Sequence, residues 1–292
     1  MAVEQKAFIV QNVASMRAEP DARSERVSQA ILGDPVTILE AGEEYSLIRT
    51  QDEYEGWTRT LWLSSEEEVS RLSVSPDAIR EKIKARVIAP IVDFRTGLEE
   101  NGLHTTKLVF GTTVSLSARK AKVVEGTKPG SIFVQLRTGE TGFLAGGTLL
   151  SIDALDGFKP DLAIKFARQF TGTPYLWGGT TAFGYDCSGF VQRLYSMFGV
   201  ILPRDAYKQA VSTLGSTLEK GEDWRVGDLV FFTSERDPLG RGITHVGMAI
   251  DRDRFIHASG KLGVAITPRN DPYYTQFYLS AWRYLAISGS KC

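Results

Sequence analysis

Three residues of the C-terminal half could together perform nucleophilic catalysis: Cys187, His245 and His257. The sequence contains only two cysteines and three histidines. Cys187 follows the loop 175–185 and opens a stretch whose apolar residues recur with helical periodicity, which predicts a thiol at the first turn of a helix. Unpaired amide groups and the helix dipole at that position favour a thiolate, so we expect a lowered thiol pKa.

The two histidines belong to neighbouring predicted strands. Residues 245–250 and 255–258 have the composition of strands, and the polar residues 251–254 between them form a predicted turn. Antiparallel pairing across this turn brings the two imidazoles close together. One ring can then take the cysteine proton while the other holds the first ring in its working tautomer, as in Cys-His-X enzymes.

Other interpretations of these residues remain open. A single free cysteine is more often a small buried hydrophobe, and a lone strand histidine is usually structural. Cys187, His245 and His257 could also bind a metal, but no C-x-x-C or H-x-x-x-H spacing supports this, so we expect no metal. His104 lies among polar residues, which indicates a surface histidine. The second cysteine, Cys292, leaves no disulfide framework to hold the fold together.

Composition restricts the classes of partner. The 292 residues are 42% hydrophobic and 24% charged, which is typical of a globular protein with two or three domains. Lys and Arg number 34 against 35 Asp and Glu, so we expect neither nucleic acid nor a membrane as partner. No apolar run reaches the roughly 18 residues of a membrane span, and no signal-peptide stretch is found. We therefore expect a cytoplasmic protein, unless an export signal has been removed.

The N-terminal half contains two stretches with the pattern of small β barrels. Residues 1–70 and 87–154 alternate short β-rich runs with Gly, Asp and Pro. Trp57 in the first stretch corresponds to Phe143 in the second, which indicates a tandem repeat. Residues 71–86 between them are predicted to form a helical linker.

Residues 155–292 differ in character from the β modules. Apolar residues at a spacing of four after Pro160 predict a helix, a second helix begins at Cys187, and strands follow from residue 228 onward. Helices followed by antiparallel strands indicate an α+β domain.

Six motifs of this region resemble, in their order and content, the NlpC/P60 cysteine peptidases of bacterial cell walls. The resemblance implies a papain-like α+β fold, no cofactor, Cys187 as the nucleophile, His245 as the base and His257 as the orienting third residue. It also implies that the two β modules are similar to bacterial SH3 domains. The motifs are Tyr175-Leu176-Trp177-Gly178-Gly179, Asp186-Cys187-Ser188-Gly189-Phe190-Val191, Pro203-Arg204-Asp205, Gly227-Asp228-Leu229-Val230-Phe231-Phe232, Thr244-His245-Val246-Gly247 and Phe255-Ile256-His257-Ala258.

Two such modules ahead of the catalytic domain resemble the γ-D-glutamyl-L-diamino acid endopeptidases that recycle wall peptides. This resemblance implies cleavage after D-Glu in L-Ala-γ-D-Glu-diamino acid peptides with a free amino group. It also implies that Glu19 and Tyr54 of the first module bind this amino group. A carboxylate pairs with an ammonium group and leaves an acylated N-terminus without a partner. Without the resemblance, Glu19 would be a solvated loop charge, and Tyr54 and Trp57 would be barrel packing.

The resemblance also indicates residues around the nucleophile. The amide of Cys187 becomes a candidate oxyanion donor. Ala206 stands where related sequences often carry serine or threonine, which calls one expected hydrogen bond to the substrate into question. The remaining candidates for substrate binding are Tyr175, Trp177, Asp186, Ser188 and Asp205.

The expected partner is therefore a murein peptide, with two other functions left open. An exported hydrolase of intact wall would need an export signal, which the sequence does not display. A wall-binding protein without activity would not need the intact Cys187, His245 and His257. The sequence does not choose between diaminopimelate and lysine as the third peptide residue, and it indicates no oligomeric state.

Overall fold

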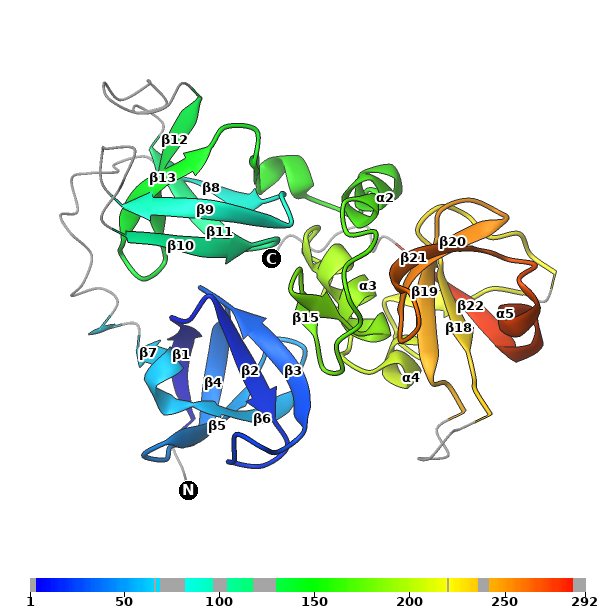
Figure 1. Ribbon diagram of the computed structural model, residues 1–292, viewed down its shortest axis with the longest axis horizontal. Coiled ribbons are helices and arrows are strands. Elements are labelled where there is room, and N and C mark those ends of the chain that lie inside the picture. The colour runs from blue at the N-terminus through cyan, green and yellow to red at the C-terminus, as the bar shows by residue number, and fades with distance from the viewer. Residues whose placement is uncertain are drawn as a thin grey trace. The chain divides into compact units, whose positions relative to one another are not determined.

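The computed structural model describes residues 4–65, 67–68, 82–96, 104–117, 130–219, 221–235 and 242–285. The chain divides into two compact units, Met1–Leu155 and Asp156–Cys292. Figure 1 shows strands throughout the first unit and helices together with strands in the second. Each unit encloses buried hydrophobic clusters.

The first unit begins with a seven-stranded antiparallel sheet. Its strands alternate as a half-buried sheet requires: Ala14 and Met16 are fully buried, while their neighbours along the strand are partly exposed. The spatial order of the strands is β3-β2-β6-β5-β4-β1-β7. In chain order, the elements are β1 (Gln5–Ile9), β2 (Val13–Arg17), β3 (Arg26–Ile31), β4 (Pro35–Glu40), β5 (Tyr45–Arg49), β6 (Glu55–Arg59), the 3-10 helix η1 (Thr60–Trp62) and β7 (Leu63–Ser65).

A second seven-stranded sheet of the same unit repeats this topology. Its order, β10-β9-β13-β12-β11-β8-β14, is the first order with seven added to each strand number. The registers also agree, since Arg17 pairs with Trp57 in the first sheet and Arg95 with Phe143 in the second. The elements are β8 (Lys82–Val87), β9 (Ile91–Thr96), β10 (His104–Val109), β11 (Thr113–Ser117), β12 (Ser131–Leu136), β13 (Thr141–Ala145), β14 (Leu149–Ser151) and the 3-10 helix η2 (Asp153–Leu155).

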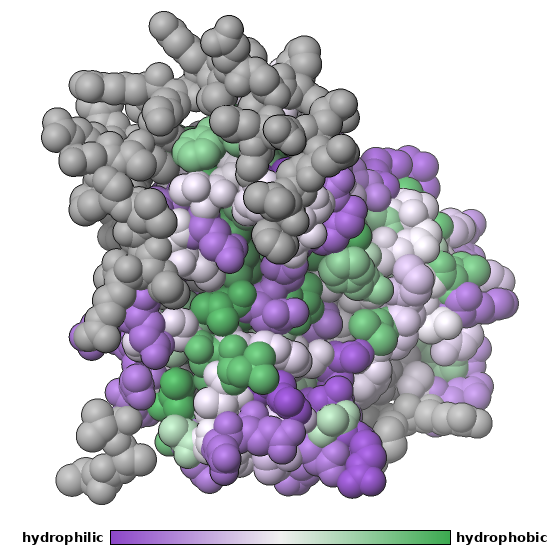
Figure 2. Space-filling view, turned by 60° about the vertical axis from the view of Figure 1, so that its left-hand side comes forward, coloured by the Kyte–Doolittle hydropathy of each residue, from purple (hydrophilic) through white to green (hydrophobic). Residues whose placement is uncertain are grey.

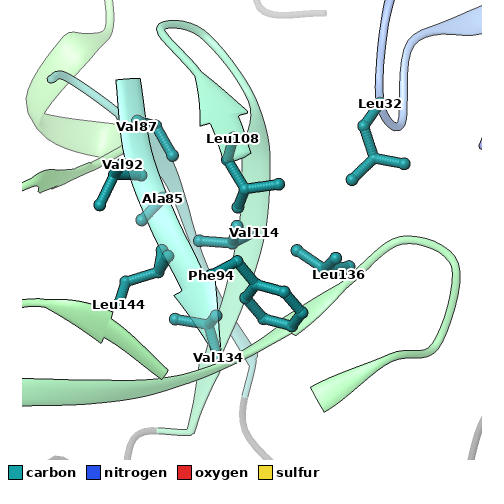
Figure 3. Packing of buried hydrophobic residues seen from close by; sticks show 10 residues of the cluster. All are labelled: Leu32, Ala85, Val87, Val92, Phe94, Leu108, Val114, Val134, Leu136 and Leu144. Atoms are coloured by element: carbon teal, nitrogen blue, oxygen red, sulfur yellow. The ribbon is translucent and has the colours of Figure 1, made fainter. Parts of the chain in front are cut away.

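The second sheet encloses a compact apolar cluster (Figure 3). Phe94, Leu108 and Val134 are among its members that are almost completely inaccessible to solvent. Leu32, which directly follows β3 of the first sheet, joins this cluster from its edge. An apolar side chain that follows a strand of the first sheet is therefore packed into the core of the second.

The predicted helical linker 71–86 extends too far at its C-terminal end. Residues 82–86 belong to β8, and residues 71–81 lie outside the described residues. Ala85 and Val87 are fully buried and alternate with Lys84 and Arg86. This period of two is that of a strand, and it overrides the helical spacing of four between Ile79 and Ile83 in the sequence.

The second unit has helices first and one antiparallel sheet afterwards, the α+β arrangement that the sequence predicts. Helix α3 packs against β19 and β20. The sheet order is β17-β22-β18-β19-β20-β21. In chain order, the elements are α2 (Pro160–Arg168), β15 (Thr180–Thr181), β16 (Gly184–Tyr185), α3 (Cys187–Ser196), α4 (Ala206–Gln209), β17 (Gly215–Thr217), β18 (Leu229–Phe232), β19 (His245–Ala249), β20 (Arg254–Ser259), β21 (Gly263–Pro268), α5 (Pro272–Phe277) and β22 (Tyr278–Tyr284).

The surface mixes polar and apolar residues. On the face shown in Figure 2, hydrophobic residues are interspersed among hydrophilic ones. In the described parts of the chain, no helix combines the length and apolarity that a membrane crossing requires.

The corresponding glycines of the two sheets, Gly56 and Gly142, predict unequal responses to alanine. A Cβ at Gly142 would lie 2.5 Å from the carbonyl oxygen of Arg95 and 2.7 Å from the ring of Phe94. At Gly56, the nearest atom would be Cβ of Met16 at 3.1 Å. We expect Gly142→Ala to lower the free energy of unfolding by about 1–3 kcal/mol through overpacking, and Gly56→Ala to lower it less. Urea unfolding followed by circular dichroism measures both.

Gly260→Ala is the control, because an added Cβ there meets no atom within 4 Å. Equal stability of the Gly142 and Gly260 variants would contradict the close approach described at β13.

Candidate active site

Cys187 is the first residue of α3, and its position is fixed from both sides. Asp186 caps the helix by accepting a hydrogen bond from the backbone N–H of Gly189 at 2.7 Å. The sulfur in turn accepts a hydrogen bond from the backbone N–H of Val246 in β19. The thiol therefore lies at the contact between the start of α3 and the sheet.

The two histidines form a hydrogen-bonded pair beside this contact. His245, the neighbour of Val246, begins β19, and its Nε2 lies 2.8 Å from Nδ1 of His257 in β20. His257 is fully buried, and its Nε2 lies 2.9 Å from Oγ1 of Thr267. Pairing of β19 with β20 thus joins the two imidazoles, and the Val246 contact brings Cys187 to the same place.

Burial determines the protonation of all three groups. It raises the pKa of the Cys187 thiol to about 12, and the negative charge of Asp186 acts in the same direction. The amides of Val246 and Ser188 and the charge of Arg204 lower this pKa but do not compensate. The expected lowering of the thiol pKa by the helix N-terminus is therefore wrong, because desolvation of the thiolate outweighs the dipole.

The imidazoles are neutral for the same reason. Burial lowers the pKa of His245 to about 4, although the charge of Asp186 opposes the shift. Burial lowers the pKa of His257 to about 2, and a charge on His245 would lower it further. Burial of each group thus favours the neutral thiol and the neutral rings.

A buried ion pair supports the start of α3. Arg204 is 3% exposed and donates to both carboxylate oxygens of Asp186. The Asp186 carboxylate also accepts from the backbone N–H of Gly178 at 3.0 Å. Ser188 accepts from Arg204 at 2.9 Å and donates to Asp186 at 3.3 Å. Two of the side chains predicted to bind substrate, Asp186 and Ser188, thus form hydrogen bonds inside the protein, and their contact with a substrate stays a prediction.

Tyr175 and Trp177 lie on the loop before the nucleophile. Tyr175 is half-buried, and its pKa is raised by burial and by the charge that a Cys187 thiolate would carry. Trp177 is 62% exposed, and its contact with a substrate stays a prediction. Asp205 precedes α4 and pairs with Lys208 at 3.4 Å.

Glu19 and Tyr54 belong to the first unit. Glu19 follows β2 and is exposed, and Tyr54 directly precedes β6 and packs against the core of the first sheet. Because β2 and β6 are antiparallel neighbours with Arg17 opposite Trp57, the end of one strand lies beside the start of the other. The two residues therefore share one end of the sheet.

Three further residues of this site were not singled out by the sequence. Arg204 belongs to one of the six motifs. Its place between apolar segments was the signal that could have indicated its part in the site. The sequence contains no such signal for Thr267 and Tyr274, because residues with hydroxyl groups are common on strands and short helices. The side chain of His104, the third histidine, lies outside the described part of the chain. Within the described part, no group of three His, Cys, Asp or Glu residues is arranged to hold a metal ion.

Comparisons with known proteins agree with this architecture. Residues 172–283 match the NlpC/P60 family, and residues 16–60 match the bacterial dipeptidyl-peptidase Sh3 domain. The chain is 30% identical over 268 residues to gamma-D-glutamyl-L-lysine dipeptidyl-peptidase of Bacillus cereus, covering 88% of this chain and 75% of that protein. It is 41% identical over 121 residues to the murein DD-endopeptidase MepS/murein LD-carboxypeptidase of Escherichia coli K12, covering 41% of this chain and 60% of that protein.

A solved structure has the same fold. The crystal structure of an NlpC/P60 family protein from Bacillus cereus superimposes with a TM-score of 0.78 at 23% identity. It covers 96% of this chain and 100% of that chain.

The neutral thiol predicts the pH dependence of alkylation. Because the pKa of Cys187 is raised, the thiolate fraction falls about tenfold for each pH unit below that pKa. We expect the iodoacetamide reaction at Cys187 to accelerate continuously from about pH 6 to about pH 9, measured by mass spectrometry of the Cys187 peptide. N-acetylcysteine, the control, levels off above its ordinary pKa of about 8.5. A rate at Cys187 that is constant across neutral pH would instead reveal a thiolate–imidazolium pair.

The ion pair beneath the nucleophile predicts a large loss of stability when it is broken. Asp186→Asn leaves the charge of Arg204 buried without its counter-ion, so we expect unfolding to become easier by about 3–5 kcal/mol. Asp205→Asn is the matched control, because its pair with Lys208 is partly exposed and is worth at most about 1 kcal/mol. Denaturant unfolding of both variants tests this, and similar losses would refute it.

Proposed function

The chain belongs to the NlpC/P60 family and is a cysteine peptidase acting on peptidoglycan, and from this premise we propose its substrate and role. The substrate is a wall peptide with a free N-terminal L-Ala, and the bond cut joins the γ-carboxyl of D-Glu to the diamino acid. The products are L-Ala-D-Glu and a peptide that begins with the diamino acid.

The observation that carries the chemistry is the contact of α3 with β19 and β20. It combines a thiol at a helix start with a hydrogen-bonded imidazole pair, His245 and His257, at 2.8 Å. A nucleophile, a base and a group that orients the base are the requirements of acyl transfer by a cysteine.

The proposed reaction begins with both Cys187 and His245 neutral. The sulfur attacks the γ-carbonyl carbon while its proton moves to Nδ1 of His245, the ring nitrogen that does not face His257. The carbonyl oxygen becomes an oxyanion, and the backbone N–H of Cys187, which has no intrahelical acceptor in the first turn, donates to it. We propose that proton transfer and bond formation occur in the same step, in keeping with the burial that raises the pKa of the thiol.

The intermediate then decomposes in two further steps. The oxyanion collapses, the C–N bond breaks, and His245 returns the proton to the departing amine of the diamino acid. Water attacks the resulting thioester with His245 again as base, which releases L-Ala-D-Glu and restores the thiol.

The proposed specificity resides in the amino end of the peptide. Glu19 is exposed, and no partner of its carboxylate is found among the described residues, so it is available to pair with an ammonium group. Tyr54 lies at the same end of the sheet. An acylated amine offers no charge and leaves the carboxylate unpaired, which penalises such a substrate.

Selection of a free amine also suggests the biological role. Peptides still attached through their amino end would be rejected, and released peptides would be accepted. We therefore propose that the protein recycles released wall peptides in the cytoplasm. The relative named gamma-D-glutamyl-L-lysine dipeptidyl-peptidase supports the bond, and its name favours lysine as the third residue of its own substrate.

A peptide assay tests the proposal. L-Ala-γ-D-Glu-diaminopimelate, its lysine analogue and their N-acetylated forms are incubated with the protein, and products are identified by mass spectrometry. We expect L-Ala-D-Glu from the free-amine peptides only, and no product with Cys187→Ala. Cleavage by the Cys187 variant would refute the nucleophile, and equal cleavage of acetylated and free peptides would refute the selection.

The same assay addresses Glu19. Because Glu19→Gln removes a charged partner worth about 1.5–3 kcal/mol, kcat/KM for the free-amine peptide should fall by roughly tenfold or more. Glu43→Gln changes another exposed carboxylate of the same sheet and is the control. Equal kcat/KM values for Glu19→Gln and Glu43→Gln would refute the proposal that Glu19 binds the substrate amine.

A further inference from the structure

Three hydroxyl groups surround the histidine pair without a part in the mechanism above. Oγ1 of Thr267 in β21 lies 2.9 Å from Nε2 of His257. The hydroxyl of Tyr274 in α5 lies 3.5 Å from Nδ1 of the same ring. The side chain of Ser259, the last residue of β20, hydrogen-bonds the hydroxyl of Tyr274. His257 is thus contacted by a hydroxyl at each ring nitrogen.

One end of this network has a fixed direction. The backbone N–H of Leu262 can only donate, and it donates to Oγ of Ser259 at 3.1 Å. The Ser259 hydroxyl can then direct its own proton to the oxygen of Tyr274. With that oxygen accepting, the proton of Tyr274 is directed to Nδ1 of His257.

Tyr274 is held in place for this contact. Asp271 caps α5 by accepting from the backbone N–H of Tyr274 at 3.3 Å. Its ring packs edge-on against Phe255 and His257, with centroids 5.2 and 4.9 Å apart. Burial raises the pKa of Tyr274 to about 12, so the hydroxyl keeps its proton at neutral pH.

A neutral imidazole has one donor nitrogen and one acceptor nitrogen, so the direction of one hydrogen bond determines the direction of the others in the network. If Nδ1 of His257 accepts, its Nε2 carries the proton and donates to Thr267. The single lone pair of this Nδ1 is then shared between Nε2–H of His245 at 2.8 Å and the more distant Tyr274 hydroxyl at 3.5 Å, which leaves Nδ1 of His245 with a lone pair. If Nδ1 of His257 instead donated to Nε2 of His245, the proton of His245 would lie on its Nδ1. That nitrogen could then not take a proton from Cys187.

We propose that the hydroxyls of Ser259, Thr267 and Tyr274 fix the tautomer of His257, and through it that of the catalytic base. They are positioning residues, since they act on the sulfur only through the two rings. The proposal deepens the proposed peptidase mechanism and rests on it for its consequence, although the tautomer itself is a property of the protein without substrate.

Nitrogen NMR of the full-length protein labelled with 15N-histidine tests the tautomer directly. The chain has only three histidines, so the spectrum is simple to assign with His245→Ala and His257→Ala variants. We expect His245 and His257 to be protonated at Nε2 and unprotonated at Nδ1 near pH 7. Protonation of His245 at Nδ1 would overturn the proposal.

Tyr274→Phe removes the hydroxyl and retains the ring. We expect NMR signals of mixed tautomers and a fall of about tenfold in kcat with little change in KM. Tyr273→Phe, on the same helix and 55% exposed, is the matched control and should leave both unchanged. An unchanged tautomer and unchanged kcat in Tyr274→Phe would overturn the proposed direction of the network.

Thr267 provides a second, independent variant. Thr267→Val leaves the Nε2 proton of His257 without an acceptor and should disturb the tautomer, while Thr267→Ser should restore it. Circular dichroism confirms that each variant is folded before the spectra are compared. A Thr267→Ser protein that is as perturbed as a folded Thr267→Val protein would show that packing, not the hydroxyl, matters at this position.

The two proposals fail separately. If none of the peptides is cut but the resting tautomers are as expected, the proposed substrate falls and the tautomer assignment stands. If the peptides are cut and the resting tautomers are the opposite ones, only the assignment falls.

Discussion

The buried carboxylate of Asp186 joins the segments from which the catalytic cysteine is presented. Its two oxygens accept hydrogen bonds from the loop at Gly178, from the first turn of α3 at Gly189, and from the guanidinium of Arg204. The net stabilisation from a buried pair is modest, but removal of one partner leaves an unpaired buried charge. Asp186 therefore acts chiefly as a constraint on geometry. The position of Cys187 depends on this one side chain.

The same constraint has an electrostatic consequence. A negative charge next to the nucleophile opposes ionisation of the thiol, and burial opposes it more strongly. The helix N-terminus alone would produce a reactive thiolate, whereas the folded site holds a neutral thiol. In the mechanism proposed above, His245 accepts the proton during attack, so the proton arrangement of His245 and His257 matters for reactivity.

Local sequence pattern was sufficient where the determinants are local. The helix start at Cys187, the strand pair carrying the two histidines, and the α+β order follow from periodicity and turn residues. The direction of the thiol pKa shift did not follow, because desolvation arises from elements distant in the chain. The start of the second sheet at Lys82 was missed because one spacing of four competed with a strand alternation. Thr267 and Tyr274 were invisible because only the packing of β21 and α5 brings them to His257.

The two sheets of the first unit share a topology but differ in the residues that follow their second strands. Both sheets have the same strand order and the same Arg–aromatic register, so equivalent positions can be counted from Arg17 and Arg95. Glu19 stands two residues after Arg17, and the second copy has Gly97 there. Residues 16–60, in the first copy, match the bacterial dipeptidyl-peptidase Sh3 domain. The second copy therefore shares the topology of the first but has no carboxylate at the position of Glu19. This difference is expected if recognition of the amine depends on loop side chains. It is also expected if the second sheet serves packing, through its contact with Leu32.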